Sequence, residues 1–176
     1  MRINKNILIT GRPGCGKSTL VQKLKSEFIE RKISGILTPE IRRGNQRCGF
    51  KIIDLSSGKE EIMASVDIKS KIRVSKYYVD VRAVNRIMNQ FIKGYENSDI
   101  FMVDEIGKME LYSEKFKKAI QKILDSEKPV IATIALSRDP FIDSIKKRND
   151  SKVFHLEKGN WESVFDNIRT SIRQLL

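Results

Sequence analysis

Residues 11–18 read Gly-Arg-Pro-Gly-Cys-Gly-Lys-Ser and form a complete G-x-x-x-x-G-K-[ST] pattern. The preceding residues 3–10 contain a short apolar run that predicts a buried strand, and residues 20–28 are apolar at helical spacing. A strand, a glycine loop and a helix in this order place backbone N–H groups and a helix start around an anion. This context predicts a phosphate-binding loop and disfavours a chance match in a glycine-bearing turn.

The loop should bind the phosphates of a nucleotide. The residues expected to do so are Gly11, Arg12, Pro13, Gly14, Cys15, Gly16, Lys17, Ser18 and Thr19. Lys17 should reach the β- and γ-phosphates, where its charge matters most as the transition state forms. Thr19 is a candidate contact of the α-phosphate. Cys15 stands at a position that the pattern leaves free, so a small tolerated residue explains it better than a redox role.

The bulk properties predict one folded domain over residues 1–176, with 40% hydrophobic and 32% charged residues. No apolar stretch approaches a membrane span, and no secretory signal core precedes the loop, so we expect a cytoplasmic protein without membrane contact. We also expect a monomer. With Cys15 and Cys48 as the two cysteines and His155 as the one histidine, a zinc site lacks ligands.

The net charge is +12, which favours anionic partners, either nucleotides or nucleic acid. The basic residues are scattered rather than run together, and aromatic residues make up only 7% of the chain. A solvated, lysine-rich surface is therefore the preferred explanation, and nucleic acid is a less favoured partner.

Helical patterns alternate with apolar strands, which predicts an α/β fold with a mainly parallel sheet flanked by helices. Residues 33–81 depart from this alternation, because short strands with glycine-bearing turns predict an antiparallel hairpin or β-meander at the sheet edge. The remaining expected elements are a helix capped by Asp80, a strand at 99–105, a helix at 113–125, a strand at 130–136, a helix opened by Asp139-Pro140, a strand at 153–156 and a C-terminal helix from about Trp161.

A second segment completes the predicted site. Residues 100–103 are apolar, and Asp104 follows at the end of the expected strand, where open α/β sheets bind ligands. Asp104 and Ser18 can hold Mg²⁺, and Glu105 can orient and polarise the water that attacks the γ-phosphorus. Ordinary solvation of a strand end is the alternative for this acidic pair. The segment predicted to bind nucleotide comprises Ile100, Phe101, Met102, Val103, Asp104, Glu105, Ile106 and Gly107.

Two further residues are accessory candidates. Thr133 interrupts an apolar strand and either senses the γ-phosphate or simply bonds its hydroxyl to the backbone. Arg138 follows residues 130–136 at the ligand-facing end and could stabilise transition-state charge. The other arginine candidates for that role are Arg12, Arg42, Arg43, Arg73 and Arg148.

The sequence contains no recognisable motif that would bind a particular nucleotide base. Residues 104–107 fit the D-x-x-G of GTPase switches, but the guanine-reading N-K-x-D does not occur, and no adenine signature is found. This combination predicts a protein that binds the triphosphate and tolerates different bases.

Three stretches together resemble the THEP1 family of nucleoside-triphosphatases, whose vertebrate members are called cancer-related nucleoside-triphosphatases. They are residues 11–19, residues 35–42 with Gly44, Arg47, Gly49 and Phe50, and the D-E-I-G-K-M-E-L stretch at 104–111, which is the most specific. The resemblance implies a RecA-like P-loop fold of the additional-strand, catalytic-glutamate class. It also implies Mg²⁺-dependent hydrolysis of ATP, GTP, CTP and UTP to diphosphate and phosphate. The residues predicted above to be catalytic are Glu105, Lys17 and Asp104.

The leading functional prediction is therefore a slow, base-tolerant nucleoside-triphosphatase. A nucleotide or small-molecule kinase is the main alternative, with Arg42, Arg43 and Arg47 either on a mobile basic lid or on a solvated hairpin. A nucleic-acid-linked ATPase module ranks third, because no nucleic-acid motif accompanies the positive charge.

Overall fold

The computed structural model of the protein describes residues 4–176, so Ile3 of the predicted first strand lies outside the described residues. Within the described residues, the first strand begins at Asn6. The strands are β1 (Asn6–Thr10), β2 (Ile33–Leu37), β3 (Glu40–Arg43), β4 (Gln46–Asp54), β5 (Glu60–Ser65), β6 (Arg73–Val74), β7 (Tyr77–Val79), β8 (Ile100–Ile106), β9 (Val130–Ile134) and β10 (Ser151–His155). The helices are α1 (Lys17–Glu27), α2 (Val81–Gly94), α3 (Glu114–Asp125), α4 (Pro140–Lys146) and α5 (Trp161–Arg173), with short 3₁₀ turns at Tyr95–Asn97, Glu110–Tyr112 and Lys158–Asn160.

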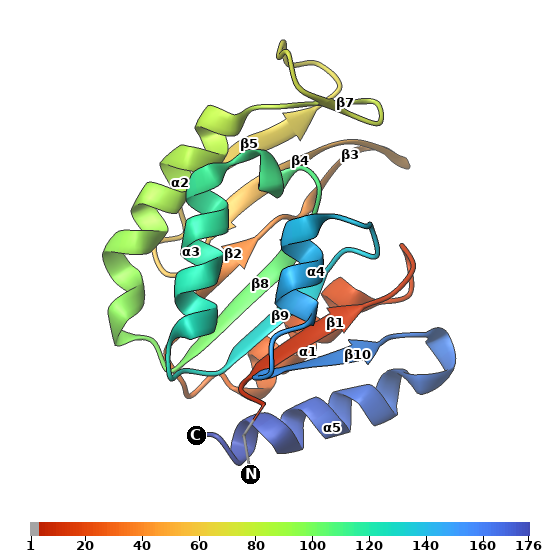
Figure 1. The fold of residues 1–176 in the computed structure, drawn as a ribbon. Helices are drawn as coiled ribbons and strands as arrows, with labels where there is room; N and C mark the ends of the chain where they lie inside the picture. Colours follow the sequence, from red (N-terminus) through yellow and green to blue (C-terminus); the bar gives the residue numbers. More distant parts are fainter. Residues whose placement is uncertain (1–3) are drawn as a thin grey trace.

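A single sheet runs through the described part of the chain in the order β10-β1-β9-β8-β2-β4-β5-β7-β6, and β3 pairs with β4 (Figure 1). The five strands from β10 to β2 pair in parallel, which confirms the predicted α/β class. Strand β9 lies between β1 and β8, so an additional strand separates the strand before the glycine loop from the strand that ends in acids. This is the arrangement that the resemblance implied.

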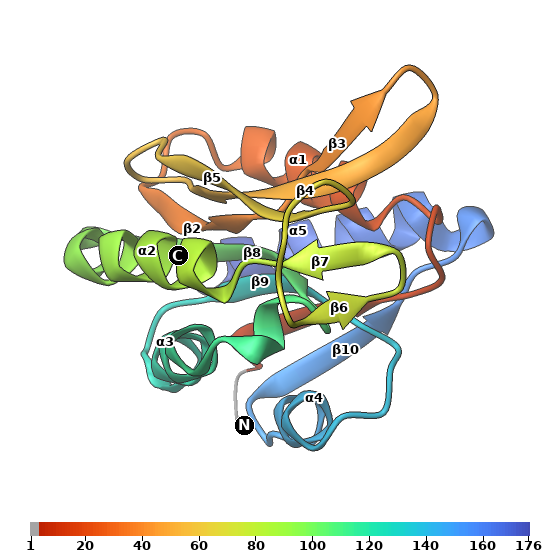
Figure 2. The ribbon, with the colours of Figure 1, turned by 90° about the horizontal axis from the view of Figure 1, so that it is seen from above.

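The antiparallel insertion is smaller than predicted. Strand β2, the first strand of the expected meander at 33–81, pairs in parallel with β8 and antiparallel with β4, so it belongs to the central sheet. Gly35 explains the close pairing, because a Cβ there would lie 1.7 Å from the Met102 carbonyl oxygen. The antiparallel part therefore runs from Glu40 to Val79, and its β3–β4 hairpin extends away from the body of the sheet (Figure 2).

Helices cover the parallel strands on both sides. Helices α2, α3 and α4 pack on one face, and α1 and α5 pack on the other (Figure 2). The alternation of side chains along β8 divides it between the two cores, since Phe101 and Val103 face α3 while Ile100 and Met102 face α1 and α5. Burial of side chains of this size contributes roughly 1.5–3 kcal/mol each. No helix among residues 4–176 is both long and apolar enough to cross a membrane.

The predicted helix starts are confirmed by their caps. Asp80 Oδ1 accepts hydrogen bonds from the N–H groups of the first turn of α2, at 2.9 and 3.2 Å. Ser113 Oγ accepts one from Phe116 N at 3.0 Å at the start of α3, and Asp139 caps α4. The strand predicted over 130–136 ends at Ile134 instead, and the Leu136 side chain that follows is half exposed.

Candidate active site

Residues 11–16 form the glycine loop that joins β1 to α1. Gly14 and Gly16 have φ angles of 77° and 98°, in the left-handed region that favours glycine. The side chain of Lys17 folds along the loop, and its Nζ donates to the carbonyl oxygens of Gly11 at 2.8 Å and Arg12 at 3.1 Å. The ammonium group is therefore held at the loop, where a phosphate could replace these carbonyl partners.

The start of α1 offers the other groups expected of a phosphate site. The first helical hydrogen bond runs from Leu20 N to Gly16 O at 2.9 Å, so the N–H groups of the first turn lack helical partners. Ser18 and Thr19 are exposed at this end of the helix, as are Pro13 and Gly14 in the loop. This end of α1 therefore presents N–H groups and hydroxyl groups toward solvent.

Strand β8 continues past the expected strand end to Ile106, so Asp104 lies two residues before its end, where segments on both sides hold it. The Thr133 hydroxyl on β9 donates to Asp104 Oδ1 at 2.5 Å, and the Thr38 hydroxyl just after β2 donates to the Asp104 carbonyl oxygen at 2.7 Å. Thr38 Oγ1 also accepts from Glu105 N at 3.0 Å, and the peptide bond between Asp104 and Glu105 is cis. Thr133 thus bonds a carboxylate instead of the backbone oxygen that one interpretation assigned to it.

Glu105 is half-buried beside Asp104. Burial raises the pKa of its carboxyl group, the charge of Lys17 lowers this pKa, and the charge of Asp104 raises it. Strands β1 and β8 both pair in parallel with β9, with Ile9 opposite Thr133 and Val103 opposite Ala132, so the glycine loop after β1 and the acidic pair of β8 lie at the same edge of the sheet. The sequence-predicted catalytic residues are therefore brought into one place.

Glu110 is an acidic group of this region that sequence reasoning did not single out. It is buried, and burial together with the charge of Glu105 raises its pKa to about 8, although hydrogen bonds from the backbone N–H groups of Glu110 and Gly107 and from Thr38 oppose the rise. Gly107 leaves room for both carboxyl groups, since a Cβ there would lie 2.6 Å from Glu105 Oε1 and 3.1 Å from Glu110 Oε2. Only its place in the D-E-I-G-K-M-E-L stretch hinted at Glu110.

The remaining predicted residues divide into supporting and exposed groups. Residues 100–103 have no exposed surface, so they position Asp104 from the two cores rather than face a ligand. Within residues 4–176, Arg12 and Arg138 are exposed and form no ion pair. The other arginines proposed for a lid or for transition-state stabilisation are engaged: Arg42 and Arg47 pair with Glu40, Arg43 pairs with Asp67, Arg73 bonds Ser75 O, and Arg148 pairs with Asp125 and Asp150.

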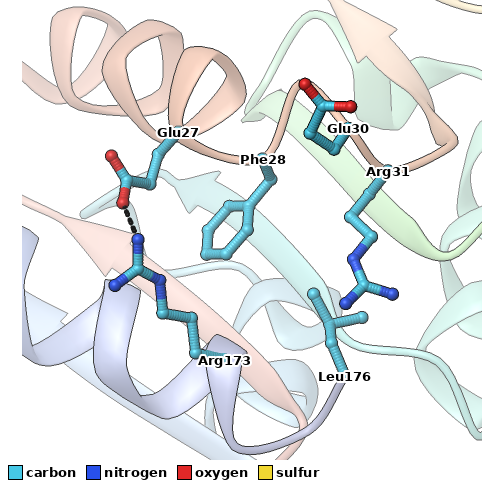
Figure 3. Close-up of a pocket in the computed structure, with 6 residues that line it drawn as sticks. All are labelled: Glu27, Phe28, Glu30, Arg31, Arg173 and Leu176. Atoms are coloured by element: carbon cyan, nitrogen blue, oxygen red, sulfur yellow. Dashed lines mark hydrogen bonds and ion pairs between the residues drawn. The ribbon is translucent and has the colours of Figure 1, made fainter.

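A small recess of about 190 Å³ lies elsewhere, between the end of α1 and the end of α5 (Figure 3). Glu27 pairs with Arg173 across its edge, and Phe28 and Leu176 line its apolar part. It is smaller than usual ligand sites, and the length of α1, about 16 Å, separates it from the glycine loop. The candidate active site is therefore the loop and the acidic end of β8.

The comparisons with known proteins agree with this geometry. A family model described as NTPase matches residues 6–169. The nucleoside-triphosphatase THEP1 of Thermotoga maritima is 46% identical over 168 residues, covering 95% of each chain. The nucleoside-triphosphatase THEP1 of Thermofilum pendens is 37% identical over 177 residues, covering 98% of this chain and 97% of that protein. The chain belongs to the THEP1 family of nucleoside-triphosphatases.

Solved structures extend the THEP1 assignment to the fold. THEP1 from Aquifex aeolicus superposes with a TM-score of 0.80 at 32% identity, covering 93% of this chain and 96% of that chain. A human cancer-related nucleoside triphosphatase superposes with a TM-score of 0.81 at 27% identity, covering 97% and 98%. Both the family and the P-loop fold class predicted from the sequence are thus confirmed.

Proposed function

We propose that this protein hydrolyses nucleoside triphosphates to diphosphate and phosphate, at the site formed by residues 11–19 and the end of β8. The observation that carries the proposal is the parallel pairing of β1 and β8 with β9, which brings a phosphate-binding loop and an acid that can act on water to the same edge of the sheet. The curated relatives, which are called nucleoside-triphosphatases and cover nearly the whole chain, support the same reaction.

Mg²⁺ fits the oxygen groups present at the site. The Ser18 hydroxyl is exposed at the start of α1, and the Asp104 carboxylate keeps Oδ2 free of the hydrogen bond that Thr133 makes to Oδ1. These two residues would hold the ion, which when bound neutralises charge on the β- and γ-oxygens. The hydrogen bond from Thr133 keeps the Asp104 carboxylate oriented toward the ion. Lys17 binds the β- and γ-phosphates that the ion contacts.

Glu105 is the group that acts on the attacking water. As a carboxylate it orients the water by accepting a hydrogen bond, and the water oxygen forms a bond to the γ-phosphorus as the bond to the β–γ bridging oxygen breaks. Thr38 accepts from the Glu105 N–H and so fixes the backbone that carries this carboxyl group. The products are a nucleoside diphosphate and inorganic phosphate.

We infer slow turnover and tolerance of ATP, GTP, CTP and UTP. Slow turnover is supported by the ion pairs that occupy Arg42, Arg43 and Arg47, because an arginine placed on the phosphates normally adds several powers of ten. Base tolerance is supported by the missing N-K-x-D. A monomeric state and a cytoplasmic location stay predictions.

The test is a phosphate-release panel over the four triphosphates, with Mg²⁺ or with EDTA. Glu105→Gln should keep nucleotide binding and lose at least about 100-fold in kcat, whereas Lys17→Ala should weaken binding and turnover together. Glu127→Gln, which changes an exposed acid just after α3, is the matched control and should behave as the native protein. Undiminished phosphate release from Glu105→Gln would refute the role of Glu105.

The same panel separates the two alternatives. A kinase would transfer phosphate to nucleosides, nucleoside monophosphates or small alcohols faster than it releases phosphate to water. A nucleic-acid-linked ATPase would be stimulated by RNA with a steep dependence on salt. Neither acceptor transfer nor RNA stimulation is expected.

A further inference from the structure

Trp161, the single tryptophan of the chain, contacts the glycine loop from the first turn of α5. Its indole Nε1 donates a hydrogen bond to the Gly16 carbonyl oxygen at 3.2 Å, across 145 positions of sequence. The ring also lies against the backbone of Gly16, because a Cβ there would be 3.1 Å from Nε1 and 3.2 Å from Cδ1. The reaction proposed above does not use this contact.

Neighbouring side chains hold the indole in place. The ring of Trp161 stacks on that of Phe165, with centroids 5.9 Å apart and planes 5° from parallel. Lys23 Nζ lies over both rings, 4.9 Å from the centroid of Trp161 and 4.5 Å from that of Phe165. The indole is therefore fixed between α1, α5 and the glycine loop.

The turn between β10 and α5 places the indole of Trp161 against the glycine loop. The Asn160 side chain accepts from Glu157 N at 2.8 Å and donates to the His155 carbonyl oxygen at 2.9 Å, so it ties both sides of the turn. Earlier in the turn, the Leu156 carbonyl oxygen lies 2.5 Å from the place of a Cβ at Gly11. The turn thus contacts the glycine loop at its first residue, and the indole contacts its end.

The hydrogen bond from Trp161 acts on the orientation of one peptide unit. The Gly16 carbonyl oxygen accepts from Leu20 N at 2.9 Å as well as from the indole. In a trans peptide the carbonyl group and the following N–H point in opposite directions. Two donors on the Gly16 oxygen therefore direct the Lys17 N–H the other way, toward the start of α1, where an anion binds.

We propose that Trp161 is a positioning residue of the phosphate site, which fixes the Gly16–Lys17 peptide so that the Lys17 N–H points at the bound phosphate. The inference rests on the proposed nucleotide site. Because the Lys17 N–H would contact the phosphates before and during the reaction, its loss should weaken binding of ground state and transition state alike. Removal of the indole donor should therefore raise KM and the Kd for ADP by about three- to ten-fold and leave kcat unchanged.

The decisive variant is Trp161→Phe, which keeps an aromatic ring on Phe165 and removes the N–H. Its Kd for ADP with Mg²⁺, measured by calorimetric titration, should rise while kcat stays native. Asn160→Ala, which loosens the turn but keeps the indole, should raise the Kd in the same direction. The matched control is Ile168→Val, a buried change two turns further along α5 that lowers stability without touching the loop.

The outcomes separate a positioning role from packing and from failure of the site itself. If Ile168→Val loses as much ADP affinity as Trp161→Phe, or if Trp161→Phe binds ADP as the native protein does, the positioning role is overturned. Lys17→Ala is titrated alongside. Native ADP affinity in Lys17→Ala would instead show that the nucleotide site is misassigned, whereas weak binding in Lys17→Ala with native binding in Trp161→Phe rejects the role of Trp161 alone.

Discussion

Glu110 is a carboxyl group that is buried without an ion-pair partner among residues 4–176. An acid in such a place remains protonated to higher pH, because burial penalises its charged form and the nearby Glu105 carboxylate repels a second negative charge. Its neighbours come from two separate stretches of chain: Thr38 after β2, and Glu105 and Gly107 around the end of β8. A single residue therefore couples the acidic end of β8 to the stability of the whole protein.

The pKa of Glu110 predicts how stability depends on pH. It is about 8 in the native protein against 4.5 for the ordinary group, so between these values the native state holds a proton that the unfolded chain has released. The contribution of Glu110 to the free energy of unfolding is therefore fully present below pH 4.5. It is lost as the pH rises from there through about 8, by up to about 1.4 kcal/mol per pH unit. Glu110→Gln should flatten this decline in urea unfolding between pH 5 and 8, whereas parallel curves for Glu110→Gln and the native protein would contradict the assigned burial. Glu127→Gln is the exposed control.

At the scale of elements, local sequence signals predicted most helices but not every strand partner. Asp80, Ser113 and Asp139 mark helix starts because a cap is made within three residues of chain. The sequence alone favours an antiparallel meander for Ile33–Leu37, because a short apolar run has the same pattern in a parallel core strand and in an antiparallel edge strand. What decides its partner is the approach of Gly35 to β8, a contact between segments 67 positions apart that periodicity does not encode.

The different surroundings of Gly35 and Gly94 predict opposite effects on stability when each is replaced by alanine. Gly35→Ala would place its Cβ 1.7 Å from the Met102 carbonyl oxygen, which must force β2 from β8, so we expect a loss of about 3 kcal/mol or more in the free energy of unfolding. Gly94→Ala, at the end of α2 with nothing within 4 Å of the added carbon, should be neutral or stabilising by up to about 1 kcal/mol. Thermal unfolding of both variants checks the pair, and equal stability would contradict the β2–β8 packing.

Across the whole molecule, the site combines groups of two kinds. The glycine loop and the acids after an apolar strand were predictable, since each is a local pattern whose place at a sheet edge follows from strand direction. Thr38, Glu110 and Trp161 were not, because their roles come from contacts made only when distant segments pack. Thr133 stands between the two kinds: its polarity on a buried strand was visible, but its partner Asp104 was not.

Nucleotide binding should stabilise the whole molecule against thermal unfolding. The size of this stabilisation in variants should distinguish residues that bind the nucleotide from residues that act only in hydrolysis. A ligand that binds only the native state at 100 times its Kd adds about 2.7 kcal/mol, which for a chain of this size raises Tm by about 5–10 °C. With Mg²⁺ and a nonhydrolysable ATP analogue, the native protein should show this rise and Lys17→Ala should lose most of it. Glu105→Gln should keep the rise or exceed it, because the substitution removes a negative charge beside the γ-phosphate without removing a phosphate donor. If Glu105→Gln lost the rise as Lys17→Ala does, Glu105 would be a binding group, and the water-activating role assigned to it would have to pass to another residue.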